Sequence, residues 1–198
     1  MEQFFTLYLK LFFMMTPFFV LSIFLTLGKR LNKVEKKAVI TKLGITVFVA
    51  SMVFLLFGKY IFSLFGITLD AFKVGAGVVL FLSALDMIRN DAEVPETEAS
   101  KGPDFAVVPL AIPTAVGPGM IGILMLIGAQ ITGIGNILLV ISSLVAAIFS
   151  LLVVLLMANK IQQLLGSQGL EILPKITGLF VAAIGAQIVF SGVHGLLV

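Results

Sequence analysis

The sequence contains no cysteine and no tryptophan, and its single histidine is His194. Without cysteine there can be no disulfide, no thiolate nucleophile and no cysteine-ligated metal, and one histidine cannot form a histidine cluster. Charged residues are also scarce, at 12% of the chain. These absences exclude disulfide scaffolds and Cys- or His-based metal centres, and we expect neither a cofactor nor a metal.

The common signatures of nucleotide-driven and hydrolytic enzymes are missing as well. The sequence has no GxxxxGK phosphate loop, no HExxH and no GxSxG, which are the local patterns that hold a triphosphate, a catalytic zinc or a nucleophilic serine. We therefore expect neither ATP-driven pumping by this chain nor enzyme activity.

Apolar residues, in contrast, are abundant. They make up 60% of the 198 residues, and the mean hydropathy of +1.18 is far above that of soluble domains. The apolar residues also form long uninterrupted runs, whereas a soluble core of this size would alternate with polar faces. The composition therefore predicts an integral membrane protein.

Six runs have the length of about 20 residues that a membrane-spanning helix needs. They cover residues 4–27, 40–62, 71–88, 107–128, 135–158 and 176–197. We interpret the first run as a permanent helix rather than a cleaved signal, because its basic cluster follows it and no small-residue cleavage site is evident. The predicted fold class is an all-α membrane protein with six spans.

Lysine and arginine are distributed unevenly between the two sides that these spans define. One side carries Lys29, Arg30, Lys33, Lys36, Lys37, Lys42, Arg89, Lys101, Lys160 and Lys175, and the other carries only Lys10, Lys59 and Lys73. Short basic loops remain in the cytoplasm, so the richer side is predicted to be cytoplasmic. Both termini are then outside, and the positive net charge indicates contact with anionic lipid rather than with nucleic acid.

The segment 89–104 is the longest polar stretch, and it contains Asp91, Glu93, Glu96 and Glu98 together with Pro95, Gly102 and Pro103. Such a composition predicts a solvated linker. It divides the chain into a first three-helix unit, residues 1–88, and a second one, residues 105–198. Because three is odd, the second unit enters the membrane from the opposite side, which predicts an inverted repeat.

Equivalent positions in the two halves support this repeat. Pro17 in the first span and Pro118 in the fourth are 101 residues apart, and the same offset relates Asp86 to Gln187. Lys73 and Lys175, at nearly the same offset, precede the third and sixth spans.

The fourth span contains three prolines within ten residues, Pro109, Pro113 and Pro118. Each internal proline removes a backbone hydrogen bond, at a cost of about 3 kcal/mol in an ordinary helix, so a regular helix is not expected there. Broken helices at matching positions of two halves are typical of a transporter's substrate site. The alternative is that the prolines only kink the helices for packing; we favour that for Pro17 alone, and function for the cluster from Gly117 to Gly119.

Two polar residues lie inside the third and sixth spans. Asp86 is a candidate for ion coupling because an intramembrane carboxylate is expensive, although an ion pair with Arg89 one turn later is an equally good interpretation. Gln187 lies deeper, where an amide bonds either to substrate or to a neighbouring helix.

Three segments, in the same order, resemble those of a known family. They are Val107–Pro118 (VVPLAIPTAVGP), residues 65–88 (FGITLDAFKVGAGVVLFLSALDMI), and residues 164–192, in which a glycine-containing loop leads into the span with Gln187. The chain thus resembles the MarC/SnatA family of six-span prokaryotic inner-membrane proteins over nearly its whole length. Family members often carry Asn or Asp before the first-span proline and a glycine soon after it, whereas this chain has Thr16, Pro17, Phe18 and Phe19.

This resemblance implies a transporter of small neutral amino acids, such as glycine or alanine, in the inner membrane. We expect alternating access between the halves, with H⁺ and Na⁺ as the candidate coupling ions. The predicted substrate-binding residues are Thr16, Pro17, Pro113, Thr114, Gly117, Pro118, Gly119 and Gln187, with Asp86 as the ion-coupling candidate. The alternatives are a passive channel or a membrane scaffold that acts through partners.

Overall fold

The structure is a computed structural model that describes residues 2–89 and 103–197. Within this part of the chain all regular structure is helical. The first half contains α1 (Glu2–Met14), α2 (Pro17–Leu27), η1 (Gly28–Arg30), α3 (Lys33–Phe65) and α4 (Leu69–Arg89). The second contains η3 (Pro103–Ala106), η4 (Val107–Ala115), α5 (Pro118–Gln130), α6 (Ile134–Leu156) and α7 (Ala158–Leu197).

Five helical segments in the described residues are long and apolar enough to cross a membrane. They are Glu2–Arg30, Lys33–Gly58, Leu69–Arg89, Ile134–Leu156 and Gln168–Leu197. The fourth predicted span is instead divided between η4 and the shorter apolar helix α5. The structure therefore confirms a helical membrane protein with irregular first and fourth spans. Of the predicted linker 89–104, residues 90–102 lie outside the described part of the chain.

The helix of the second span begins at Lys33 rather than at residue 40. Asn32 starts it with a capping box: its Oδ1 accepts hydrogen bonds from the backbone N–H of Val34 and Glu35, both at 2.9 Å, and Glu35 Oε2 accepts one from the N–H of Asn32 at 2.8 Å. A capping box determines where a helix begins, whereas hydropathy reports only where it enters lipid. The additional turns carry the basic residues that the sequence assigns to the cytoplasmic side.

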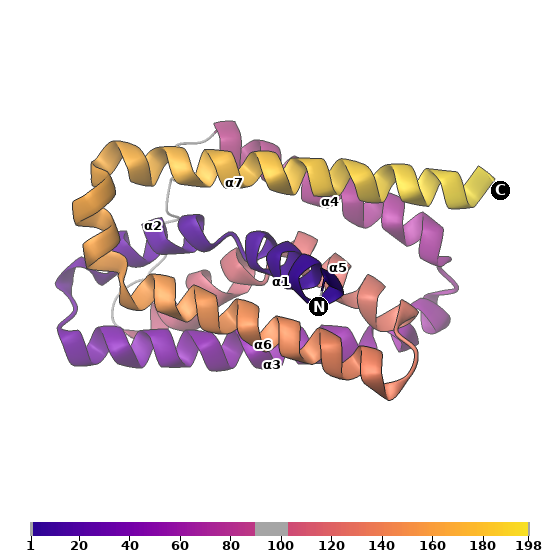
Figure 1. Ribbon diagram of the computed structural model, residues 1–198, viewed down its shortest axis with the longest axis horizontal. Helices are drawn as coiled ribbons and strands as arrows, with labels where there is room; N and C mark the ends of the chain where they lie inside the picture. The colour runs from indigo at the N-terminus through magenta and orange to yellow at the C-terminus, as the bar shows by residue number, and fades with distance from the viewer. Residues whose placement is uncertain (1, 90–102, 198) are drawn as a thin grey trace.

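Helix α7 also starts earlier than predicted, because the expected loop before the sixth span is helical. The only interruption within its range is Gly166, whose φ of 65° and ψ of −172° are not helical. Glycine adopts this conformation without steric cost. The short segment 158–165 therefore turns across one end of the bundle before the long part of α7 begins (Figure 1).

The helices run lengthwise, with their connections at two ends (Figure 1). We call the end with η1, the start of α3, the end of α4 and the start of α7 the basic end, because it carries Lys29, Arg30, Lys33 and Arg89. The C-terminus lies at the opposite end. This arrangement matches the charge asymmetry from which the orientation was predicted.

Helix α5 lies inside the bundle, packed against both α3 and α4. Seven of its thirteen residues are buried, so it meets other helices rather than lipid over most of its surface. The core around it contains large side chains from both halves, among them Leu11, Leu21, Phe24, Leu43, Phe105, Leu110, Leu124 and Leu151. Lipid-facing side chains on α3, α4, α6 and α7 remain exposed, as a membrane protein requires.

Candidate functional site

The first span is broken at Thr16, between α1 and α2. Thr16 adopts a left-handed conformation, with φ of 47° and ψ of 56°, which is unusual for a β-branched residue. Pro17 follows in the first turn of α2, where its fixed φ and missing N–H are tolerated. The predicted irregularity at Pro17 is therefore a full change of helix at Thr16 rather than a mild kink.

The fourth span is broken more extensively, and its prolines explain how. Val108 and Ile112 are extended, with φ near −125° and ψ of 124°, because the residue before a proline is forced out of the helical region. The Val116 N–H bonds to the carbonyl oxygen of Ala111 at 2.8 Å, five residues back, which is a π-type bond. Gly117 is again extended, and Pro118 opens α5.

The two breaks meet. The hydroxyl of Thr16 donates a long hydrogen bond, 3.5 Å, to the carbonyl oxygen of Thr114. Thr114 lies in the last turn of η4, four residues before Pro118. Both threonines are half-buried. A carbonyl at the break in one half is thus bound by a hydroxyl at the break in the other.

The glycines at the second break allow close approach rather than leaving open space. A Cβ at Gly117 would lie 2.7 Å from the carbonyl oxygen of Pro113. Gly119 is buried, and a Cβ there would clash with the side chain of Leu80 on α4. Packing against α4 therefore accounts for Gly119 without a ligand, and Pro113 and Pro118 are exposed.

The structure does not join the two remaining predicted residues to the breaks. Gln187 is exposed on α7. Asp86 is exposed in the last turn of α4, and no ion pair with Arg89 is among those found in the described residues. Of the predicted site residues, the structure brings together those of the first and fourth spans.

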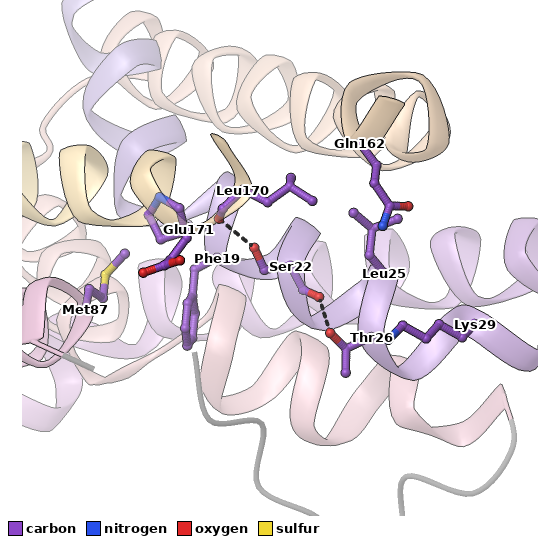
Figure 2. A pocket seen from close by; sticks show the side chains of 10 residues that line it. Phe19, Ser22, Leu25, Thr26, Lys29, Met87, Gln162, Leu170 and Glu171 are labelled. Carbon is purple, nitrogen blue, oxygen red and sulfur yellow. Dashed lines mark hydrogen bonds between the residues drawn. The ribbon is translucent and has the colours of Figure 1, made fainter. Parts of the chain in front are cut away.

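A cavity of about 240 Å³ adjoins the first break. It lies between α2, the end of α4 and the first part of α7, and Figure 2 shows its side chains converging from these elements. Its polar residues are Ser22, Thr26, Lys29, Gln162 and Glu171, and its apolar ones are Phe19, Leu25, Met87, Leu170 and Pro174. None of these was predicted as a site residue.

A sequence signal for this cavity does exist. Ser22, Thr26 and Lys29 are spaced by four and three residues, so they follow one face of α2 into η1. Ser22 donates to the carbonyl oxygen of Phe18 at 3.1 Å and to that of Leu170 at 3.3 Å. Leu170 needs this donor because Pro174, four residues later, has no N–H.

This contact repeats the relationship between Thr16 and Thr114. In each case a hydroxyl from the first span binds a carbonyl that lies four residues before a proline in the second half. In lipid such a carbonyl has to be satisfied by protein, water or ligand. Hydroxyls of the first half therefore connect the two halves at two levels of the bundle.

One acidic residue of the cavity is already in an ion pair. Glu171 accepts a bond from Lys175 Nζ at 3.2 Å through its Oε1 atom, and its side chain is 54% exposed. At the start of α4, Asp70 and Lys73 form a similar pair at 2.6 Å. No group of three or more potential metal ligands occurs in residues 2–89 and 103–197.

Comparison with known proteins gives a consistent result. Residues 1–197 match the family described as MarC family integral membrane protein. The chain is 34% identical to the UPF0056 membrane protein MJ1677 of Methanocaldococcus jannaschii, covering 100% of this chain and 98% of that protein.

Two bacterial proteins are similar as well. A UPF0056 membrane protein of Aquifex aeolicus is 30% identical, covering 100% of this chain and 97% of the relative. The UPF0056 membrane protein YvbG of Bacillus subtilis is 29% identical, with 96% and 93% covered. No solved structure matches. The match over the whole chain shows that this protein belongs to the MarC family of integral membrane proteins.

Proposed function

We propose that this protein is a secondary transporter of small polar solutes, with the solute bound where the two broken spans meet. The observation that carries the proposal is the hydrogen bond between Thr16 and the carbonyl of Thr114. It joins two helix ends, each close to a proline, in the interior of the bundle. Half-helix ends of this kind bind ions and polar solutes in membranes.

The proposed substrates are small neutral amino acids such as glycine and alanine. Their carboxylate suits the N–H groups at the first turn of α2 or α5, and their ammonium suits carbonyls such as that of Thr114. The resemblance to the MarC/SnatA family supports the same class. The printed names of the relatives state only that they are membrane proteins.

An inverted repeat would give such a transporter its two alternating states. Contacts between α4 and α7 support it. A Cβ at Gly77 would lie 2.8 Å from the carbonyl oxygen of Gly185, and one at Gly178 would lie 3.0 Å from that of Ala84. Positions 77 and 178 differ by 101, as do 84 and 185, so the repeat offset exchanges the two contacts.

In such a repeat the first and fourth spans occupy equivalent positions relative to the α4–α7 pair. Rocking one half against the other would expose the breaks alternately to each side. A hydrogen bond as long as 3.5 Å is weak and breaks at small cost, which suits a contact that has to open and close. We place the basic end in the cytoplasm of a prokaryotic cell and both termini outside.

A passive channel or a scaffold is the competing function. Few polar side chains lie along the described spans, and a wide aqueous pore needs a polar lining. A scaffold has no need for backbone groups freed at matching positions. The helix breaks therefore favour a solute-binding protein.

Uptake of labelled glycine and alanine into proteoliposomes, with imposed proton or sodium gradients, tests the proposal. We expect accumulation that depends on one gradient and identifies the coupling ion. Equilibration without accumulation in either gradient would contradict secondary transport and favour a channel. Absence of any uptake by folded protein would reject this substrate class.

Gly119→Leu is the first variant, and it should abolish uptake because the new side chain meets Leu80. Since that clash also affects packing, Leu80→Ala is combined with it. Restored uptake in the double variant would assign Gly119 to packing alone. Continued loss with normal folding would support a role for the backbone at residues 117–119 in binding.

A further inference from the structure

The cavity next to α2 lies close to the proposed site along the first span. Phe19, on its wall, lies three residues after Thr16, which is about 4.5 Å along a helix with a rise of about 1.5 Å per residue. Ser22 and Thr26 follow at successive turns, and Lys29 lies at the basic end. The lining residues on the first span thus run from about one turn beyond the break towards the side that the charge asymmetry assigns to the cytoplasm.

Its size restricts what it can hold. Pockets for drug-sized ligands measure about 300–1,000 Å³, and a water molecule takes about 30 Å³ of liquid. A cavity of about 240 Å³ accommodates a solute of a few heavy atoms with some water. The cavity is therefore too small for bulky amphipathic molecules.

Its charges restrict the solute further. Glu171 and Lys29 lie on different sides of the cavity, with Ser22 between them (Figure 2). Lys175 engages Glu171 through Oε1, and a carboxylate offers about four acceptor positions on its two oxygens. A solute with one cationic and one anionic group complements the charges of both walls, whereas a solute with a single charge complements one.

The hydroxyls of the cavity are oriented as acceptors. Ser22 donates its proton to backbone carbonyls, and Thr26 donates to the carbonyl oxygen of Ser22 at 2.9 Å. A hydroxyl oxygen that has donated its proton still accepts hydrogen bonds. Both oxygens therefore favour the ammonium end of a bound molecule.

We propose that this cavity is a second solute position, in which a small zwitterion is held between Lys29 and Glu171 on its way between the helix breaks and the cytoplasm. Lys29 binds the carboxylate and Glu171 binds the ammonium group. The proposal rests on the transport function above and adds a binding site that the broken spans do not contain.

The absence of cysteine in the chain allows a direct test with single cysteines. Thr26→Cys places a thiol on the cavity wall, and Thr41→Cys is its matched control. Both threonines are exposed at the basic end and bond to the carbonyl four residues earlier, at 2.9 Å for Thr26 and 3.0 Å for Thr41, but only Thr26 lines the cavity. A membrane-impermeant thiol reagent is applied to inside-out vesicles, with glycine, alanine, acetate or methylamine added.

We expect the thiol reagent to modify both cysteines. Glycine and alanine should protect the cysteine at position 26 but not the one at position 41. Acetate and methylamine at equal concentration should protect neither. Lys29→Gln and Glu171→Gln, each in the Thr26→Cys background, should raise the half-protecting concentration about tenfold, the order expected for one charged hydrogen bond.

Three results would overturn the inference: no reaction at position 26, equal protection at 26 and 41, or protection by acetate and methylamine as strong as by glycine. Gradient-driven uptake by the same Thr26→Cys protein is measured in parallel. Uptake without protection rejects the cavity site and leaves the transport function intact. Protection without uptake by the protein supports the site and rejects transport.

Discussion

The hydroxyl of Thr16 lies 3.5 Å from the carbonyl oxygen of Thr114, 98 residues later in the chain. Each residue stands at the point where a membrane helix is interrupted, and each interruption has a proline immediately or shortly after it. The bond joins the two three-helix halves at their irregular segments. A movement of one half relative to the other would change this contact.

The conformation of Thr16 leads to the first prediction. An L-residue in the left-handed region costs roughly 1–2 kcal/mol, and asparagine is accommodated there more readily than a β-branched residue. Thr16→Asn should therefore raise the melting temperature of the detergent-solubilised protein, while its amide can still donate to the Thr114 carbonyl. Thr16→Val, which keeps the strain and removes the donor, should lower it. The reverse order would contradict the assigned conformation.

A second prediction concerns Ser22 and Pro174. Ser22→Ala leaves the carbonyl of Leu170 without its donor, because Pro174 has no N–H, and should cost about 1 kcal/mol or more. In a Pro174→Ala background the restored N–H can bond to Leu170, so the same substitution should cost less. The free energy of unfolding of the two single variants and the double variant measures this coupling. Additive effects would show that the two groups act independently.

The close packing of α4 and α7 leads to a third prediction. A Cβ at Gly185 would lie 2.9 Å from the backbone N of Phe81 and 3.0 Å from the carbonyl oxygen of Gly77, and backbone cannot move aside as a side chain can. Gly185→Ala should lower thermal stability, and Gly185→Leu should prevent folding. Gly75→Ala on α4 is the control, since nothing lies within 4 Å of its Cβ, and it should stabilise by up to about 1 kcal/mol. Equal effects at the two glycines would disprove this packing.

Ser51 provides a fourth prediction. Its side chain is completely buried in α3, and its hydroxyl has no hydrogen-bond partner in the structure. Burying such a group costs about 1–3 kcal/mol. Ser51→Ala should thus maintain or increase the melting temperature. A clear decrease would reveal a partner for the hydroxyl, such as water or a bound solute.

The fifth prediction concerns the orientation of the chain in the membrane. A fluorescent protein that matures only in the cytoplasm should be dark when fused after residue 198 of the full chain. The same reporter should fluoresce when fused after Arg89, at the basic end. Fluorescence of the full-length fusion would place the C-terminus inside and invert the assignment, because the C-terminus and the basic end lie at opposite ends of the molecule (Figure 1).

The sequence predicted the helical membrane architecture because hydropathy and charge are properties of local segments. Runs of about 20 apolar residues have to be helical in lipid. The prolines at 109, 113 and 118 each force the residue before them into an extended conformation. The resemblance to the MarC family was also readable from motifs, and it is confirmed over residues 1–197. Helix ends were less accurate, because Asn32 caps α3 well outside the apolar run.

Contacts between distant segments were decided by the tertiary structure alone. Hydropathy cannot show that Thr16 meets Thr114, that Gly119 packs on Leu80, or that Gln187 faces outwards. The cavity residues Ser22, Lys29 and Glu171 come from segments more than 140 residues apart, so their proximity depends on how α2 and α7 pack. The sequence by itself determined which segments cross the membrane and where they break; packing of the two halves decided which broken ends and polar groups face each other.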